Sequence, residues 1–167
     1  MSMDHALVEQ MKHIFEGLNV EEIKKKVDEK GIDAFINEAA RFAALTGGIA
    51  GLGGAITMVV GIPISVINTV VQQFRVTMAV IYVKRGRVTP TFDQFIKIVA
   101  MSLGVEIGVG VGAGIAAAVA AQILVRLGVG GVAAMIPLFG AAVGAGVNYA
   151  FIKAVGAALK SLDMSKI

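Results

Sequence analysis

The sequence contains no cysteine, little charge and few aromatic residues. The absence of cysteine excludes a disulfide framework, thiol catalysis, a Cys-ligated zinc site and lipidation by palmitoyl or prenyl groups. Charged residues make up 16% of the 167 positions and aromatic residues 6%, whereas ordinary soluble domains carry about 25% charge. Ser2 stands where myristoylation needs glycine, and no short apolar signal segment follows, so we expect a cytosolic N-terminus.

Charge is missing altogether from two long runs, Phe42–Phe74 and Leu127–Ile152, and the stretch 104–121 carries only Glu106. Such apolar surface has to be covered by a bilayer, by an oligomer or by lipid. Residues 1–41, by contrast, hold nine acids and six bases, while residues 42–167 hold three acids and nine bases. We therefore predict one domain with a polar, amphipathic helical segment (1–41) and an apolar Gly/Ala-rich helical core (42–162).

Hydrophobic spacing favours helices throughout, because the Val-rich pieces lack the alternation of strands. Apolar residues recur on one face of residues 4–18, and Asn19 is placed to cap a second helix that ends at Gly31. Further helices are expected over 33–61, 64–83, 92–126 and from about 137 to 162. The predicted fold is an all-α, membrane- or lipid-associated bundle of glycine/alanine-rich helical hairpins, turning at residues 61–63 and 128–131.

Glycines recur at four-residue spacing inside the apolar runs. On a helix this spacing leaves a strip without side chains, against which another helix backbone can pack closely. The sequence therefore predicts helix packing and homo-oligomer formation through Gly104, Gly108, Gly112, Gly140, Gly144 and Gly146.

Three polar residues interrupt the apolar runs and are predicted to be buried: Arg75, Glu106 and Asn148. In a membrane, ionisable groups of this kind mark a functional site or an interior ion pair. One hypothesis is a Glu106–Arg75 pair, which could line a pore. The alternative is that each group is satisfied separately at an interface or reaches water.

A small basic cluster follows the helix expected over 64–83. Its members suit anionic lipid headgroups, at about 1 kcal/mol per basic residue near a membrane surface, and the alternative is a plain solvated loop. The cluster is too small, and has too few interleaved aromatic residues, for nucleic-acid binding. The candidate headgroup-binding residues are Lys84, Arg85, Arg87 and Lys97.

No constellation for catalysis, metal binding or cofactor binding emerges. His5, Glu9 and His13 share one helix face, which is more typical of a solvent-facing stripe than of a metal site. The segment 108–113 formally matches a dinucleotide fingerprint but lacks the strand and acidic residue that the motif requires. We expect no enzyme activity, cofactor, metal, nucleic-acid partner or small-molecule substrate.

Two segments resemble the EcsC family of bacterial proteins. The first runs from Leu45-Thr-Gly-Gly-Ile-Ala-Gly-Leu-Gly-Gly54 through Ile62-Pro63 and Gln73-Phe-Arg75 to Ile81-Tyr82, and the second from Ile136-Pro137 to Asn148-Tyr149. An acid that the family carries near the first proline is absent here, and Tyr82 is followed by Val-Lys-Arg before Gly86. The resemblance implies a membrane- or lipid-associated helical protein with no established reaction.

These observations predict a non-enzymatic protein that self-assembles and organises, coats or remodels a membrane or lipid particle. The alternatives are a soluble self-assembling carrier or shell for hydrophobic cargo, and a small pore. The expected location is the cytoplasmic side of the bacterial inner membrane or a cytoplasmic lipid-bearing assembly.

Overall fold

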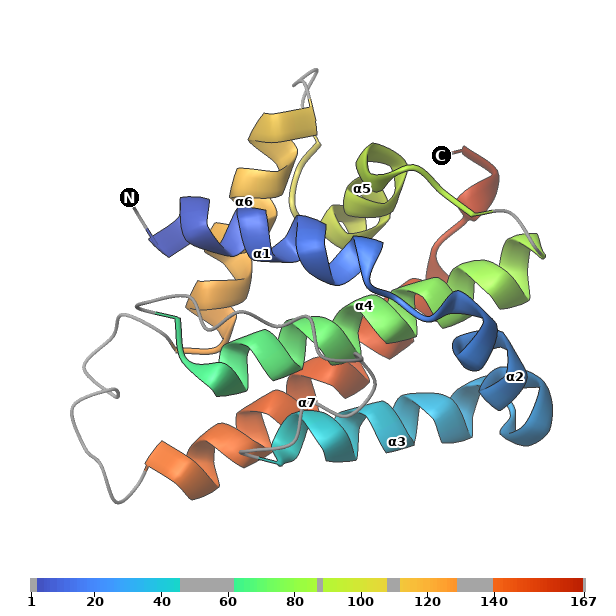
Figure 1. Cartoon of the computed structure of the whole chain (residues 1–167), viewed down its shortest axis with the longest axis horizontal. Helices are drawn as coiled ribbons and strands as arrows, with labels where there is room; N and C mark the ends of the chain where they lie inside the picture. Colours follow the sequence, from blue (N-terminus) through green and yellow to red (C-terminus); the bar gives the residue numbers. More distant parts are fainter. Residues whose placement is uncertain (1–2, 46–61, 87–88, 108–111, 129–139, 167) are drawn as a thin grey trace.

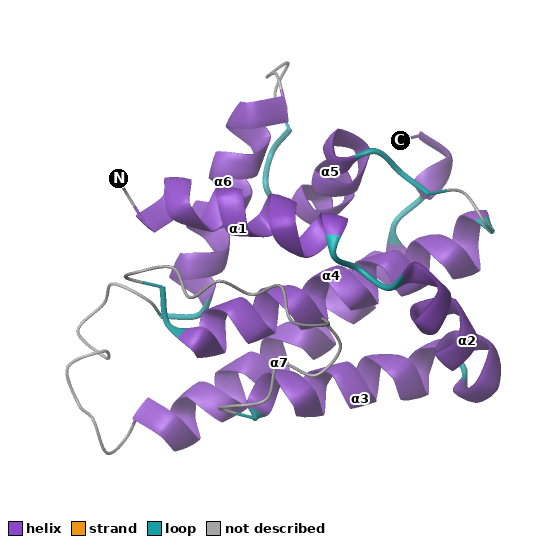
Figure 2. Cartoon of the chain, in the orientation of Figure 1, coloured by secondary structure: helices purple, strands orange, loops and turns teal. Residues whose placement is uncertain are grey.

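In the described residues (3–45, 62–86, 89–107, 112–128 and 140–166 of the computed structural model) every regular element is a helix, with no strand (Figure 2). This confirms the predicted all-α class. The helices are α1 (Met3–Glu16), α2 (Val20–Lys30), α3 (Ile32–Ala44), α4 (Ile64–Arg85), α5 (Phe92–Ser102), α6 (Gly112–Arg126), α7 (Gly140–Ser161) and the short 3-10 helix η2 (Met164–Lys166).

The helices form two layers that meet on α4 (Figure 1). One layer contains α3, α4 and α7, which pack on one another pairwise. In the other layer, α6 packs on both α1 and α5, and α1 and α5 also contact α4. Helix α2 contacts α3 and α4 at one end of the bundle. The polar segment 1–41 is therefore part of the same packed unit as the apolar core.

Helix α4 is the centre of the fold because it is buried nearly all round. Every residue from Val66 to Ile81 is buried, including Phe74, Val70 and Val71 at 0% exposure. Among the described residues α4 alone is long and apolar enough to cross a membrane, and 89% of its most apolar window lies inside the protein. The core helix of a soluble protein meets the same criterion of length and composition. In this structure α4 is enclosed by the other helices.

The N-terminal helices follow their predicted patterns. The Asn19 side chain accepts a hydrogen bond from the Glu22 backbone N–H at 3.0 Å, which confirms the expected cap of α2. On α1, the apolar face is buried through Leu7, Met11 and Ile14, each no more than 2% exposed. Burial of each such side chain stabilises the fold by about 1.5–3 kcal/mol.

The prediction of one helix over 92–126 is wrong, because α5 ends at Ser102 and α6 begins only at Gly112. Gly104 has a φ of +67°, which only glycine adopts readily. Its N–H bonds the Met101 carbonyl at 3.1 Å, and the Val105 N–H bonds the Ala100 carbonyl at 2.9 Å. This is a Schellman C-cap, and it turns the chain away before α6 begins.

The helix expected over 33–61 is also shorter than predicted. Helix α3 ends at Ala44, and Leu45 has extended backbone dihedrals of −78° and 121°. The rest of that prediction, and the turn expected at 61–63 except for Ile62 and Pro63, lies outside the described residues.

Candidate functional site

Two buried amides hold the end of α3 against α4 and α7. The Asn68 side chain on α4 donates to the carbonyls of Phe42 and Leu45, at 2.6 and 3.2 Å. Asn148 on α7 is 6% exposed and donates to the Ala43 carbonyl at 3.2 Å. The last carbonyls of a helix have no partner within the helix, so these bonds satisfy the end of α3. They also bring the end of α3 together with the early turns of α4 and α7.

Arg75 pairs with a different acid from the one predicted. Its guanidinium is buried at 3% residue exposure, lies 3.3 Å from the Glu22 carboxylate and stacks over the Phe35 ring at 5.7 Å. Glu106 is exposed in the segment after α5. The expectation of a buried Glu106 is therefore wrong, and of the two hypotheses for Glu106 and Arg75 the structure agrees with the one in which each group is satisfied separately. A pore lined by these two residues loses its structural basis.

Lys84 is engaged with the C-terminal end of α7. Its ammonium group donates to the carbonyls of Lys160 and Leu162, at 2.7 and 2.5 Å. A cation at this position satisfies helix-end carbonyls and complements the helix dipole. Arg85 is half-buried beside it, whereas Lys97 is exposed on α5, and Arg87 lies outside the described residues. The predicted headgroup cluster is thus divided between two helices, and one of its members has a structural role.

The glycines predicted to pack helices have different surroundings. Gly104 lies in a turn rather than on a helix, so the predicted strip from Gly104 to Gly112 is not continuous. Gly108 lies outside the described residues. Gly112 begins α6, and Gly140 and Gly144 lie in the first turns of α7. Gly146 is exposed, and a Cβ there would meet no atom within 4 Å.

The glycine that does permit a close approach is Gly156, which the sequence patterns missed. A Cβ on Gly156 would lie 2.8 Å from Cγ2 of Ile36, below any normal contact distance. This is where α7 and α3 pack most tightly around a missing side chain. Gly156 lies ten residues beyond Gly146, outside the predicted set of packing glycines, so the glycine spacing in the sequence did not single it out.

Three of the six exposed large apolar side chains among the described residues, Leu45, Ile64 and Val125, define what is here called the apolar end; the other three, Val83, Ile107 and Tyr149, lie on other parts of the chain. The exposures of Leu45, Ile64 and Val125 are 55%, 42% and 72%. Leu45 follows α3, Ile64 begins α4 and Val125 lies in the last turn of α6. The start of α4 and the C-terminal end of α6 lie on the left of Figure 1, and the hydrogen bond from Asn68 to the Leu45 carbonyl keeps the end of α3 beside the start of α4.

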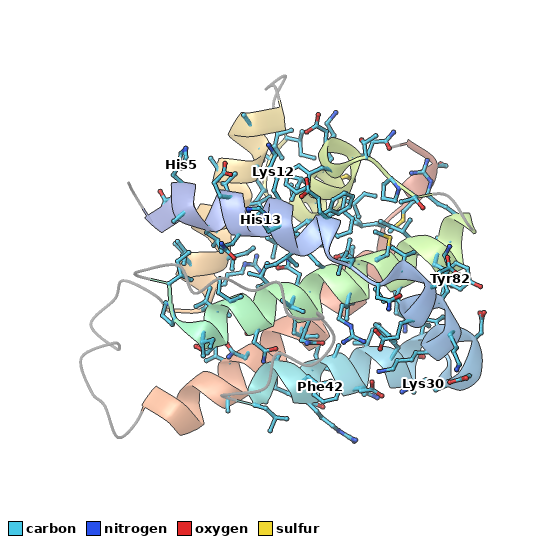
Figure 3. All side chains as sticks on the ribbon, viewed as in Figure 1. His5, Lys12, His13, Lys30, Phe42 and Tyr82 are labelled. Atoms are coloured by element: carbon cyan, nitrogen blue, oxygen red, sulfur yellow. The ribbon has the colours of Figure 1, made fainter. Side chains whose placement is uncertain are left out.

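The opposite end carries charge and is here called the charged end, defined by Lys30, Tyr82, Lys84 and Lys160. Figure 3 shows Lys30 and Tyr82 there, and the Tyr82 hydroxyl lies 3.0 Å from both carboxylate oxygens of Asp28. Helix α4 joins the two ends with 22 residues, a length of about 33 Å. Lys84 and Arg85 are therefore separated from the apolar end by nearly the full length of the molecule.

The outward faces of α6 and α7 are built largely from small residues. On α6 the exposed side includes Ala113, Gly114, Ala117, Ala118 and Ala121. On α7, Gly146, Ala150 and Ala154 are exposed at four-residue spacing. A helix facing water usually carries polar residues on its outer side. These faces are thus flat and nearly free of charge over three turns.

No group of three or more His, Asp or Glu side chains in the described ranges could hold a metal ion. His5, Glu9 and His13 remain a surface stripe on α1, with each residue exposed.

No protein-family model, curated protein or solved structure matches this chain. The resemblance to the EcsC family consequently stays a prediction from the sequence motifs.

Proposed function

We propose that this is a non-enzymatic protein that attaches to a membrane or lipid particle through its apolar end and assembles with further copies to organise, coat or remodel that surface. The observation that carries the proposal is the exposure of Leu45 and Ile64, which lie close together because Asn68 of α4 bonds the Leu45 carbonyl, and of Val125 at the end of α6. Covering these exposed aliphatic side chains with an apolar phase removes them from water and lowers the free energy of the system.

The charges near this end fit a lipid surface. Arg41 is exposed in the last turn of α3, and Arg126 is exposed in the last turn of α6. Each arginine near an anionic bilayer contributes about 1 kcal/mol. We assign headgroup contact to these two residues rather than to Lys84 and Arg85, which lie at the charged end and would face away from the same surface.

Assembly on that surface is the second part of the proposal. The outward faces of α6 and α7 carry alanine and glycine at four-residue spacing, which supports close helix–helix contact between copies. Helix α7 runs along the long axis of the bundle, whereas α6 crosses it in Figure 1, so we assign lateral contact between copies to the face of α7.

A soluble carrier of apolar cargo is the second candidate, and the burial of α4 favours it. The one described helix that is long and apolar enough to cross a membrane is enclosed by the other helices. Such a protein would purify without detergent and carry bound lipid or hydrocarbon.

The test is vesicle flotation of the purified full chain with phosphatidylcholine vesicles, with and without anionic lipid. We expect the protein to float with vesicles, more completely when they are anionic. The double substitution Leu45→Asp with Ile64→Asp should abolish flotation. Val83→Asp is the matched control, because Val83 is 52% exposed at the far end of α4 and its replacement should change nothing.

Two results would contradict the membrane proposal. One is a wild-type protein that stays out of the floating fraction with both kinds of vesicle. The other is a Leu45→Asp, Ile64→Asp variant that floats as well as Val83→Asp. Recovery of the protein as a soluble particle that yields lipid on extraction would favour the carrier instead.

A further inference from the structure

A groove of about 470 Å³ lies between α1, the start of α5 and the first turns of α6. Its inner wall is apolar and consists of Val8, Phe92, Ala116 and Ala117. The small side chains of α6 leave this space open, because each alanine contributes only a methyl group. A volume of this size accommodates a small organic molecule.

The rim of the groove is acidic. Asp4 and Glu9 from α1 and Asp93 from α5 line it together with Lys12 and His5, which gives the rim a formal charge of −2 with His5 neutral. Figure 3 shows His5 and Lys12 along α1 on this side of the molecule. Asp93 belongs to the first turn of α5, where the helix dipole favours a negative charge.

The carboxylates of the rim are not neutralised by ion pairs within the described ranges. Within the described ranges, Asp4, Glu9, Lys12 and Asp93 take part in no ion pair closer than 4.0 Å, whereas the acids of α2 and α3 are extensively paired. The rim carboxylates are therefore available to a cation, and the phenyl ring of Phe92 offers a face to an apolar or cationic group.

We propose that this groove binds a small organic amine with an apolar body. The ammonium group would lie between the carboxylates of Glu9 and Asp93, and the apolar part would cover Val8, Ala116 and Ala117. An anion is disfavoured by the net negative rim, and a neutral ligand would leave the carboxylates uncompensated. This site does not depend on the proposed lipid contact, but it shares Ala117 with the outward face of α6.

The experiment uses 2-phenylethylamine as the probe, with 2-phenylethanol and 3-phenylpropionate as the neutral and anionic counterparts. Binding to the full chain is followed by NMR shifts of the Ala116 and Ala117 methyl groups. We expect the amine to bind roughly tenfold more tightly than the alcohol, the scale of two exposed ion pairs, and the propionate not to bind. Added salt should lower the affinity of the amine and leave that of the alcohol unchanged.

Substitutions separate charge from shape. Glu9→Gln with Asp93→Asn should reduce amine affinity to that of the alcohol, whereas Glu16→Gln with Glu29→Gln removes the same charge from exposed positions outside the groove and should preserve the preference. Ala117→Trp should block both ligands by filling the groove. Equal binding of amine and alcohol, an unchanged amine affinity in the Glu9/Asp93 variant, or no shift at millimolar amine would each overturn the proposal.

Discussion

Arg75 in the middle of α4 and Glu22 in the first turn of α2 form an ion pair at 3.3 Å across 53 residues of chain. The arginine side chain is 4% exposed and the glutamate side chain 31%, so the pair bridges the core and the surface. The same Glu22 oxygen lies 3.0 Å from the Lys26 ammonium group. Glu22 is thus the acid that lets a charged residue occupy the central helix.

Replacing Glu22 by Gln should lower the free energy of unfolding by about 2–3 kcal/mol, because it leaves the buried guanidinium without this carboxylate. Urea denaturation checks the value. The control is Glu21→Gln, which removes only an exposed pair with Lys24 and should cost less than about 1 kcal/mol. Equal effects of the two substitutions would mean that Glu22 does not compensate Arg75.

The Glu38 carboxylate should make the fold sensitive to acid. Burial raises the pKa of Glu38, but hydrogen bonds and charges from Lys30 and Lys26 lower it by more, so the net shift is downward from 4.5. A carboxyl with a depressed pKa in the folded state contributes stability above its unfolded pKa and loses it as the pH falls through the folded value. Stability should therefore decline below about pH 4.5.

Glu38→Gln should make that decline shallower, measured by urea denaturation between pH 7 and pH 3. It should not remove the decline, because Lys160 lowers the pKa of Asp33 and Ser165 lowers that of Asp163 in the same direction. Parallel pH curves for the variant and the wild type would contradict the role assigned to Glu38.

Gly156→Ala should destabilise the protein, whereas Gly146→Ala should stabilise it. At Gly156 the added Cβ would lie 2.8 Å from Ile36 Cγ2, and overpacking of this kind costs about 1–3 kcal/mol, less about 1 kcal/mol from the better helix propensity of alanine. At Gly146 there is open space, so only the gain of up to about 1 kcal/mol remains. Thermal unfolding of both variants checks the signs.

A second substitution tests whether the cost of Gly156→Ala arises from the contact with Ile36. In an Ile36→Ala background, Gly156→Ala should lose most of its cost, since the clashing methyl group is gone. A cost that is unchanged in that background would place the strain elsewhere.

Assembly should depend on the outward face of α7. Ala150→Glu with Ala154→Glu introduces two charges on the strip that we propose packs against another copy, and should reduce the assembly size seen by light scattering and cross-linking. Ala34→Glu is the control, because Ala34 is exposed on α3 outside that strip. An unchanged assembly in the α7 variant would rule out this face as the contact.

The sequence predicted the elements whose signals are local and missed those that depend on packing. The apolar stripe of α1 and the Asn19 cap are local patterns, and both were correct. The end of α5 was missed because the position of Gly104 is consistent both with a strip of glycines on a helix and with a helix C-cap at positive φ. Only the tertiary structure shows that Arg75 is compensated by Glu22, since no short-range pattern links residues 53 positions apart.

Lys84 was predicted to bind lipid headgroups, and its contacts with the carbonyls of Lys160 and Leu162 give a sharper expectation. Lys84→Met should lower the free energy of unfolding by about 1 kcal/mol, the value of a charge-assisted cap at a helix C-terminus. Flotation with anionic vesicles should stay at the wild-type level, because Lys84 lies at the charged end. Lys97→Met, on an exposed site of α5, is the control and should change neither quantity. A Lys84→Met protein that keeps its stability but loses vesicle binding would return the headgroup role to Lys84, and would mean that the charged end faces the lipid.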